Sequence, residues 1–306
     1  MRFNLIASCC SGRTATVEQT LDAAVAAPTF DSVRIEKRST AGQNGPQIRP
    51  VVHRDGTVYA VFYGWRSVDI TNRVTADVVV VRDDNRGAGA YPYTDLVDNS
   101  DGIAGVRAIQ GITFTIFSEL GQQRLIGNPS IAVDPRNSST VYLAWADEQT
   151  SVSTLHIRRS TDRGSTWDSD LRTIANATNP ALAINSIGKV GLLYQRLTGT
   201  AGNQRWETHL EQTTDGSTWH DSVLASTPAA APVPQFQLYL GDYIYLMAVG
   251  RTFYGISSAS NSPNRANFPN GVRYQRNVDF ANNRLLGIDR STPVASSIDA
   301  FFVKSS

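Results

Sequence analysis

The chain has 306 residues, with 28 basic and 27 acidic side chains and a formal charge of +1 at pH 7. This near balance argues against a nucleic-acid-binding protein, which needs a basic surface. No run of about 18 apolar residues is present, so the sequence predicts no membrane span. The two cysteines, Cys9 and Cys10, are adjacent and cannot cross-link distant parts of a fold.

The first predicted element is a short amphipathic helix within residues 14–27. Apolar side chains there, including Val17 and Leu21, recur at helical spacing. We therefore assign residues 1–29 to an N-terminal segment that contains this helix. Residues 30–306 show no shift in composition and are assigned to a single domain.

After residue 30 the sequence is typical of an all-β protein. Short apolar or alternating runs are separated by turn residues. These runs are Ser32–Ile35, Thr57–Phe62, Ala76–Val81, Val141–Trp145, Leu155–Arg158, Val190–Tyr194, Tyr243–Val249 and Ile298–Val303. Residues 83–103 and 258–270 are rich in Gly, Asn, Asp, Ser and Pro and predict long loops, which are often functional.

An internal repeat indicates the architecture. One copy begins with the strand Asn128–Asp134 and ends with the turn motif Ser160–Trp167. The next begins with Asn179–Asn185 and ends with Thr213–Trp219. A period of about 50 residues with several strands in each copy is typical of a β-propeller blade.

Two further units complete the predicted ring. They begin near Gln47 and Leu240. The end strands Ser32–Ile35 and Ile298–Val303 are expected to combine in one shared blade, because closure removes open sheet edges. We predict an all-β fold, a β-propeller of four-stranded blades, with five blades favoured and six as the alternative.

The turn motif Ser160–Trp167 resembles the Asp-box of sialidases and of many other propellers. In such a turn Asp162 accepts backbone N–H bonds, Gly164 takes a positive φ and Trp167 covers the hairpin base. The strand Ile48–Pro50, followed by an Asp-Gly-Thr turn, also resembles the opening of a sialidase, although the order of the family's arginine and isoleucine differs. The resemblance covers roughly residues 45–255. It is specific for fold and weak for activity.

The resemblance implies a particular chemistry at the central face. Sialidase-like enzymes hold a substrate carboxylate with three arginines, because the planar guanidinium pairs with carboxylate through two bonds. Arg49 matches the first arginine by motif. Arg196 and Arg276, each in a Tyr-Gln-Arg triplet, are the candidates for the other two. The competing interpretation is that these arginines form ordinary salt bridges at strand ends.

A sialidase-like enzyme also uses an Asp acid/base and a Tyr nucleophile activated by Glu. Asp69 and Asp84 are the candidate acids, since both follow the first unit. Tyr243 is the candidate nucleophile, with Asp242 or Glu207 as its partner. Tyr243 could equally be a core aromatic residue, and Asp242 a residue that caps a turn.

Further candidate substrate-binding residues occupy the starts of inner strands and the connections between second and third strands, where propellers bind ligands. They are Arg66, Asn128, Asp147, Asn179, Trp65 and Trp206. The two tryptophans could stack on sugar rings, and the competing interpretation is that they pack in the core.

We predict no cofactor and no catalytic metal, because the histidines are isolated and lack metal-site spacing. Asp83, Asp84 and Asn85 offer oxygen ligands without the spacing of a calcium loop, which leaves a structural Ca²⁺ open. The start of the chain is faintly similar to a lipoprotein cleavage site at Ile6–Cys9, but its apolar stretch is shorter than a working signal peptide needs. The competing interpretation is a loose N-terminal segment. A secreted or cell-envelope location is slightly favoured over a cytoplasmic one.

Three functions are consistent with these features. The first is an exo-glycosidase of sialidase type that acts on glycans at the central face. The second is a non-catalytic propeller that binds carbohydrate or protein. The third is a scaffold whose central face is covered by another domain.

Overall fold

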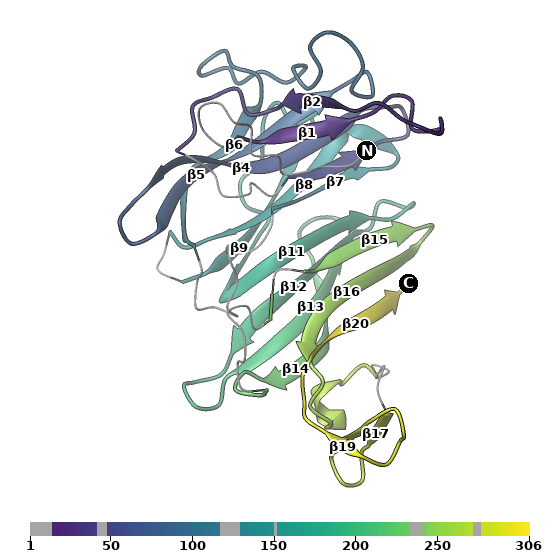
Figure 1. Cartoon of the computed structure of the whole chain (residues 1–306). Coiled ribbons are helices and arrows are strands. Elements are labelled where there is room, and N and C mark those ends of the chain that lie inside the picture. The colour runs from purple at the N-terminus through teal and green to yellow at the C-terminus, as the bar shows by residue number, and fades with distance from the viewer. Residues whose placement is uncertain are drawn as a thin grey trace.

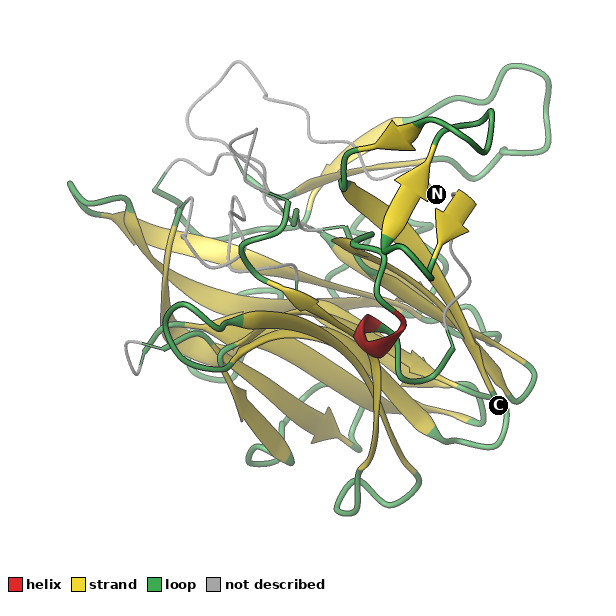
Figure 2. Cartoon of the chain, turned by 90° about the horizontal axis from the view of Figure 1, so that it is seen from below, coloured by secondary structure: helices red, strands yellow, loops and turns green. Residues whose placement is uncertain are grey.

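The computed structural model describes residues 14–41, 48–116, 129–149, 152–232, 240–241, 243–271 and 277–306. Strands dominate these ranges, with the short 3-10 turn η2 (Arg265–Asn267) in red in Figure 2. No helix in the described ranges is long and apolar enough to cross a membrane.

Four antiparallel sheets follow one another along the chain (Figure 1). The first sheet contains β3 (Arg49–Val52), β4 (Val58–Val68), β5 (Arg73–Asp83) and β6 (Val106–Thr115). The second contains β7 (Ser130–Asp134), β8 (Asn137–Asp147), β9 (Thr154–Ser160) and β10 (Arg172–Ala175). The third contains β11 (Ala177–Ile184), β12 (Val190–Thr198), β13 (Arg205–Thr213) and β14 (His220–Pro228). The fourth contains β15 (Tyr245–Val249), β16 (Thr252–Ser260) and β20 (Ile298–Ser305).

The core consists of apolar layers between successive sheets. Strand β12 is nearly continuous in apolar residues because both of its faces are buried. Leu192 belongs to the layer shared with the second sheet, whereas Leu193 belongs to the layer shared with the fourth. A strand that is buried on both faces needs apolar side chains on both. The predicted strand runs are confirmed because each lies within or overlaps an observed strand.

The turns at the ends of the inner strands hold neighbouring sheets together. His53 Nε2 lies 3.2 Å from Pro135 O, between the first and second sheets. Arg136 donates to Ile187 O at 2.8 Å, and Ser186 N donates to Gly250 O at 2.8 Å. The sheets are thus tied together in chain order around one axis, as in a propeller.

The predicted N-terminal helix is wrong. Residues Thr16–Gln19 form strand β1, which pairs with β2 (Asp31–Arg34). Val17 is fully buried against the first sheet, while Leu21 and Val25 are 64% and 52% exposed. The helical spacing therefore does not correspond to a buried face, and burial of Val17 favours the strand.

The predicted shared blade is also wrong. Strand β20, which includes Ile298–Val303, pairs with β16 as the third strand of the fourth sheet. Strand β2 pairs with β1 instead. Each end strand therefore pairs with a strand from its own end of the chain, and the two ends do not share a sheet. The blade number of five stays a prediction.

The connection from β16 to β20 is the longest within a sheet. It contains η2 and a small sheet of β17 (Asn277–Asp279), β18 (Arg284–Leu286) and β19 (Pro293–Val294). This small sheet projects from the body of the molecule (Figure 1). The predicted loop at 258–270 overlaps the start of this connection.

Candidate functional site

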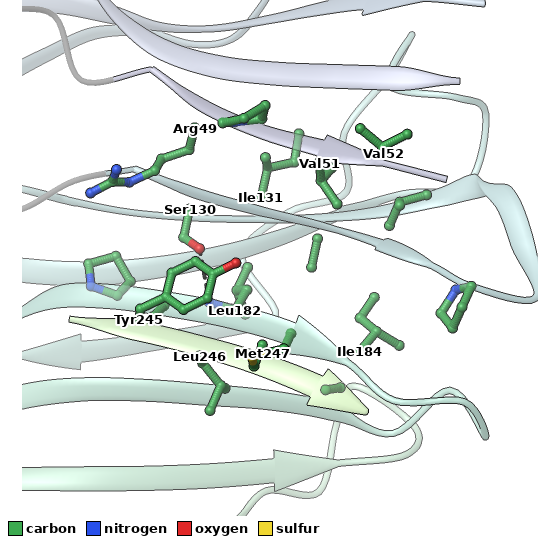
Figure 3. Close-up of a pocket in the computed structure, with 18 of the residues that line it drawn as sticks. Arg49, Val51, Val52, Ser130, Ile131, Leu182, Ile184, Tyr245, Leu246 and Met247 are labelled. Carbon is green, nitrogen blue, oxygen red and sulfur yellow. Dashed lines mark hydrogen bonds between the residues drawn. The ribbon is translucent and has the colours of Figure 1, made fainter. Parts of the chain in front are cut away.

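A pocket of about 540 Å³ lies where the four inner strands meet. Strands β3, β7, β11 and β15 each contribute residues to its wall (Figure 3). The strand order thus brings residues nearly 200 positions apart, Arg49 and Tyr245, to one cavity. We take this central pocket as the candidate site.

The wall of the central pocket is mainly apolar. Val51, Ile131, Leu182 and Met247 are typical of its lining. Among the described lining residues there is no carboxylate. The wall therefore provides contact area for apolar surfaces more than it provides acid–base groups.

Polar side chains line both ends of the central pocket. Figure 3 shows Arg49, Ser130 and Tyr245 at the end where the inner strands begin, which we call the polar end, with Val52 and Ile184 at the other end. His53 and Arg54, which follow Val52, also belong to the wall. Ser130 Oγ accepts a hydrogen bond from Leu182 N at 2.9 Å, which holds β7 against β11. Tyr245 is 62% exposed, so its ring is available to a ligand.

Tyr243 lies just before this wall and is 72% exposed. It is therefore a surface residue near the polar end of the pocket, not a core aromatic residue. Its predicted partner Asp242 lies outside the described residues, as do Asn128 and Arg276.

Asn179 is buried, with 1% exposure, and positions the chain instead of facing solvent. Its side-chain Nδ2 donates to Gln195 Oε1 at 2.8 Å and to Gly241 O at 3.0 Å. Asn179 has a φ of 55°, a left-handed conformation that asparagine tolerates better than most residues. It therefore fixes the loop that leads to Tyr243, and a direct contact between Asn179 and substrate stays a prediction.

The predicted arginines within the described residues do not converge. Arg66 pairs with Glu36 Oε2 at 3.1 Å and with Asp77 Oδ2 at 2.7 Å. Arg196 donates from Nε to Ala175 O at 3.2 Å. Of the described arginines predicted to bind substrate, Arg49 is the one that lines the central pocket.

The predicted acids Asp69 and Asp84 have structural partners. Asp69 accepts bonds from Thr71 N and Arg73 N at 2.8 and 2.9 Å in the turn between β4 and β5. The hydrogen bond from the Thr71 hydroxyl holds the pKa of Asp69 below its usual value. Asp84 pairs with the guanidinium groups of Arg82 and Arg163. A lowered pKa opposes the role of a proton donor, so Asp69 is a poor general acid.

Asp147 and Glu207 each bind a histidine. Asp147 accepts a bond from Trp145 Nε1 at 3.1 Å and lies 3.6 Å from His156 Nε2. Glu207 accepts a bond from Ser226 Oγ at 3.2 Å and lies 3.3 Å from His209 Nε2. Neither carboxylate belongs to the wall of the central pocket.

The two predicted stacking tryptophans are core residues. Trp65 is 1% exposed and Trp206 is 6% exposed. Trp65 packs edge-on against Phe114, between the first and second sheets. Their burial favours the competing interpretation, in which both rings pack in the core.

A tyrosine–carboxylate pair does exist, at a position that the sequence did not indicate. The Tyr194 hydroxyl donates to Glu211 Oε1 at 2.8 Å, and Arg172 binds both oxygens of Glu211. Burial and the adjacent Glu211 charge raise the pKa of Tyr194. Tyr194 is 1% exposed, so the group bridges the second and third sheets and has no access to substrate.

Asp83, one of the oxygen ligands for which a structural Ca²⁺ was left open, is bound by protein groups. It is buried, and its carboxylate accepts bonds from Asn85 N, Gly87 N and Tyr93 N at 2.8, 2.6 and 3.0 Å. These backbone donors satisfy the charge of Asp83, which therefore caps the loop after β5.

No family model and no curated protein matches the sequence. Among solved structures, an alpha-L-arabinanase of Penicillium chrysogenum complexed with arabinobiose has a TM-score of 0.48 and 11% identity, over 93% of this chain and 84% of its own. The GH93 alpha-L-arabinofuranosidase of Fusarium graminearum with arabinobiose has a TM-score of 0.43 and 11% identity, over 93% and 84%. A glycoside hydrolase has a TM-score of 0.42 and 10% identity, over 96% and 79%. These identities and TM-scores are too low to assign a family.

Proposed function

We propose that the protein acts on glycans and binds a sugar at the polar end of the central pocket. The observation that carries this proposal is the combination of an exposed Tyr245 ring, the Arg49 side chain and an apolar wall in one cavity of about 540 Å³. Small-molecule sites typically pair a largely apolar concave wall with a few polar groups that fix orientation.

The chemistry of these groups fits a sugar. A pyranose or furanose ring has apolar C–H surfaces, which pack against an aromatic face such as that of Tyr245. Its hydroxyl groups, or a carboxylate in an acidic sugar, accept hydrogen bonds from a guanidinium. Arg49 lies at the same end of the pocket as Tyr245 (Figure 3). Binding is the step that this geometry supports best, since the described wall holds no carboxylate.

Hydrolysis of a terminal glycosidic bond is the second candidate function. It is favoured by the exposure of Tyr243, which directly follows Asp242 in the chain and comes two residues before Tyr245 of the pocket wall. In this proposal Tyr243 attacks the anomeric carbon and Asp242 takes its proton, while the leaving sugar departs with a proton from a separate acid. Water, deprotonated by the conjugate base of that acid, then displaces Tyr243 from the anomeric carbon, and Tyr243 regains its proton from Asp242. A non-catalytic site would bind the same sugar and leave the bond intact.

A turnover assay separates the two candidates. The wild-type protein is incubated with a panel of chromogenic sialosides, arabinosides and other terminal glycosides, beside Asp242→Asn, Tyr243→Phe and Arg49→Ala. A hydrolase is supported if one substrate is turned over and Asp242→Asn slows it by roughly a hundredfold or more, the scale of a lost general base. The catalytic proposal is wrong if no glycoside is cleaved, or if cleavage is unchanged in Asp242→Asn and Tyr243→Phe.

A further inference from the structure

We propose that the protein has a second saccharide-binding site at its outer rim, and that this site takes one neutral sugar unit. The site is a shallow pocket of about 270 Å³ between β6 and the turn that joins β9 to β10. We call it the rim pocket and define it by Asn99, Arg107, Gln110, Ser165 and Trp167.

The rim pocket has an aromatic wall. Trp167 packs against the apolar layer between the first and second sheets, so its indole ring is held in place. Its Nε1 is buried and has no hydrogen-bond partner within the described part of the chain. A fixed indole is a common platform for the apolar face of a ring, because it supplies large contact area at little cost in entropy.

The other walls carry hydrogen-bonding groups with spare capacity. Asn99, Gln110 and Ser165 are exposed, and their side chains form no hydrogen bonds with other described residues. Arg107 uses Nε and Nη2 for protein contacts, to Asp98 at 3.0 Å and to Asp101 at 3.1 Å. Its Nη1 makes no hydrogen bond to any described residue, so it remains a donor for a ligand. Amide, hydroxyl and guanidinium groups together suit the alternating donors and acceptors of sugar hydroxyls.

The arginines around the rim pocket are paired with carboxylates, so the pocket has no excess positive charge. Arg107 and Arg38 face Asp98 and Asp101, with Arg38 Nε at 2.8 Å from Asp101 Oδ2 and Arg38 Nη2 at 3.5 Å from Asp98 Oδ2. Two guanidinium groups are thus neutralised by two carboxylates, and Asp162, which accepts hydrogen bonds from Thr166 of the pocket wall, adds a further negative charge. A pocket without excess positive charge gives no electrostatic advantage to an anionic ligand, which is why we assign a neutral sugar.

The rim pocket is separate from the central pocket. Its β6 residues lie on the fourth strand of the first sheet, whereas Arg49 lies on β3, the first strand. Three strand spacings of roughly 4.8 Å separate the two strands. One site can therefore be altered without touching the other, and a glycan with several branches could engage both.

The Trp167 indole provides a direct readout by NMR. In ¹⁵N-labelled protein, the Nε1–H resonance of Trp167 is identified by its loss in Trp167→Phe. The protein is then titrated separately with glucose, galactose, mannose, arabinose and glucuronate. We expect at least one neutral sugar to shift this resonance, and the double variant Asn99→Ala/Gln110→Ala to weaken that binding about tenfold, the scale of lost hydrogen bonds. Both substituted residues are exposed, so the fold should be retained, which the remaining resonances verify.

Tyr245→Ala distinguishes the rim pocket from the central pocket. The sugar-induced shift of the Trp167 Nε1–H resonance should be the same in Tyr245→Ala as in the wild type, even if Tyr245→Ala abolishes binding at the central pocket. The rim proposal is overturned if no neutral sugar shifts the Trp167 resonance, or if the shift is as strong in the double variant as in the wild type. It is also overturned if glucuronate alone shifts the resonance, since a pocket without excess positive charge should not prefer an anionic sugar.

Discussion

The buried hydroxyl of Tyr194 shows how an apparently catalytic pair can be structural. Tyr194, Glu211 and Arg172 have the chemistry of a tyrosine nucleophile with its carboxylate, yet the hydroxyl faces protein on all sides. We predict that Tyr194→Phe lowers the free energy of unfolding by about 2 kcal/mol, the usual value for a hydrogen bond to a charged group. Urea denaturation at neutral pH measures this loss.

The same variant should leave ligand binding and any glycoside turnover unchanged. If Tyr194→Phe keeps its stability but loses turnover, the tyrosine is a nucleophile and the structural interpretation fails. Removing Glu211 instead is a less clean test, because it would leave Arg172 without its partner and a buried cavity between the sheets.

His156 makes stability depend on pH. Burial by itself would lower its pKa, but the nearby Asp147 carboxylate and a hydrogen bond with Asp170 raise the pKa to about 9. The unfolded chain has a histidine pKa of about 6.5, so the stabilisation is fully present below that pH. It is lost as the pH rises from about 6.5 to about 9, because the folded protein then gives up the same proton.

We therefore expect the urea midpoint of the wild-type protein to fall across this alkaline range. In His156→Gln the corresponding fall should be absent, since glutamine does not titrate. If the urea midpoints of the two proteins fall in parallel with pH, His156 is not the cause of the alkaline loss of stability.

In the second and third sheets, a short turn motif joins the third strand to the fourth and so places the outer strand of the sheet. In the turn after β9, Ser160 Oγ accepts a bond from Gly164 N at 2.8 Å, and Asp162 Oδ1 accepts one from Thr166 N at 2.9 Å. Asp215 caps the turn after β13 in a similar way, by accepting bonds from Ser217 N and Thr218 N at 2.8 Å. Each motif thus closes the hairpin that leads to an outer strand.

Gly164 is the residue of this turn with the least tolerance for change. Its φ is +82°, a conformation that side chains with a Cβ rarely adopt. Gly164→Ala should therefore destabilise the protein by about 1 kcal/mol, the cost of a left-handed residue. Ser165→Ala, at an exposed neighbouring position, is the matched control and should unfold at the wild-type midpoint. Equal midpoints for the two variants would contradict the strain argument.

The sequence predicts elements better than it predicts their partners. The strands of the repeat were found because β8 and β12 are buried on both faces and so appear as unbroken apolar runs. The sequence does not show how the end strands pair, because pairing depends on which apolar layer remains uncovered, and that is a property of the assembled sheets.

Side-chain roles were harder still. Trp145 stacks on His156 with ring centroids 4.9 Å apart, and Tyr194 stacks on His209 at the same distance in the next sheet. This second repeat becomes visible only when the hairpin register places each aromatic residue opposite its histidine. The motif does place Arg49 at the start of an inner strand, where it lines the central pocket, and its contact with substrate stays a prediction.

The whole molecule is a series of sheets whose first strands surround one pocket (Figures 1 and 3). Buried layers and turn-to-turn hydrogen bonds hold these strands in position, so the pocket is preformed instead of assembled by the ligand. A preformed site avoids the entropic cost of ordering on binding. The proposed function therefore depends on Arg49 and Tyr245 meeting a sugar in this cavity.

Isothermal titration calorimetry with a glycan that binds the wild-type protein tests this claim directly. The same titration is performed on Arg49→Ala and Tyr245→Ala, with thermal unfolding as a check that both variants remain folded. We predict that each substitution weakens binding by about tenfold or more, since each removes a charge-assisted bond or a stacking surface. Wild-type affinity in both folded variants would show that the glycan does not bind in the central pocket.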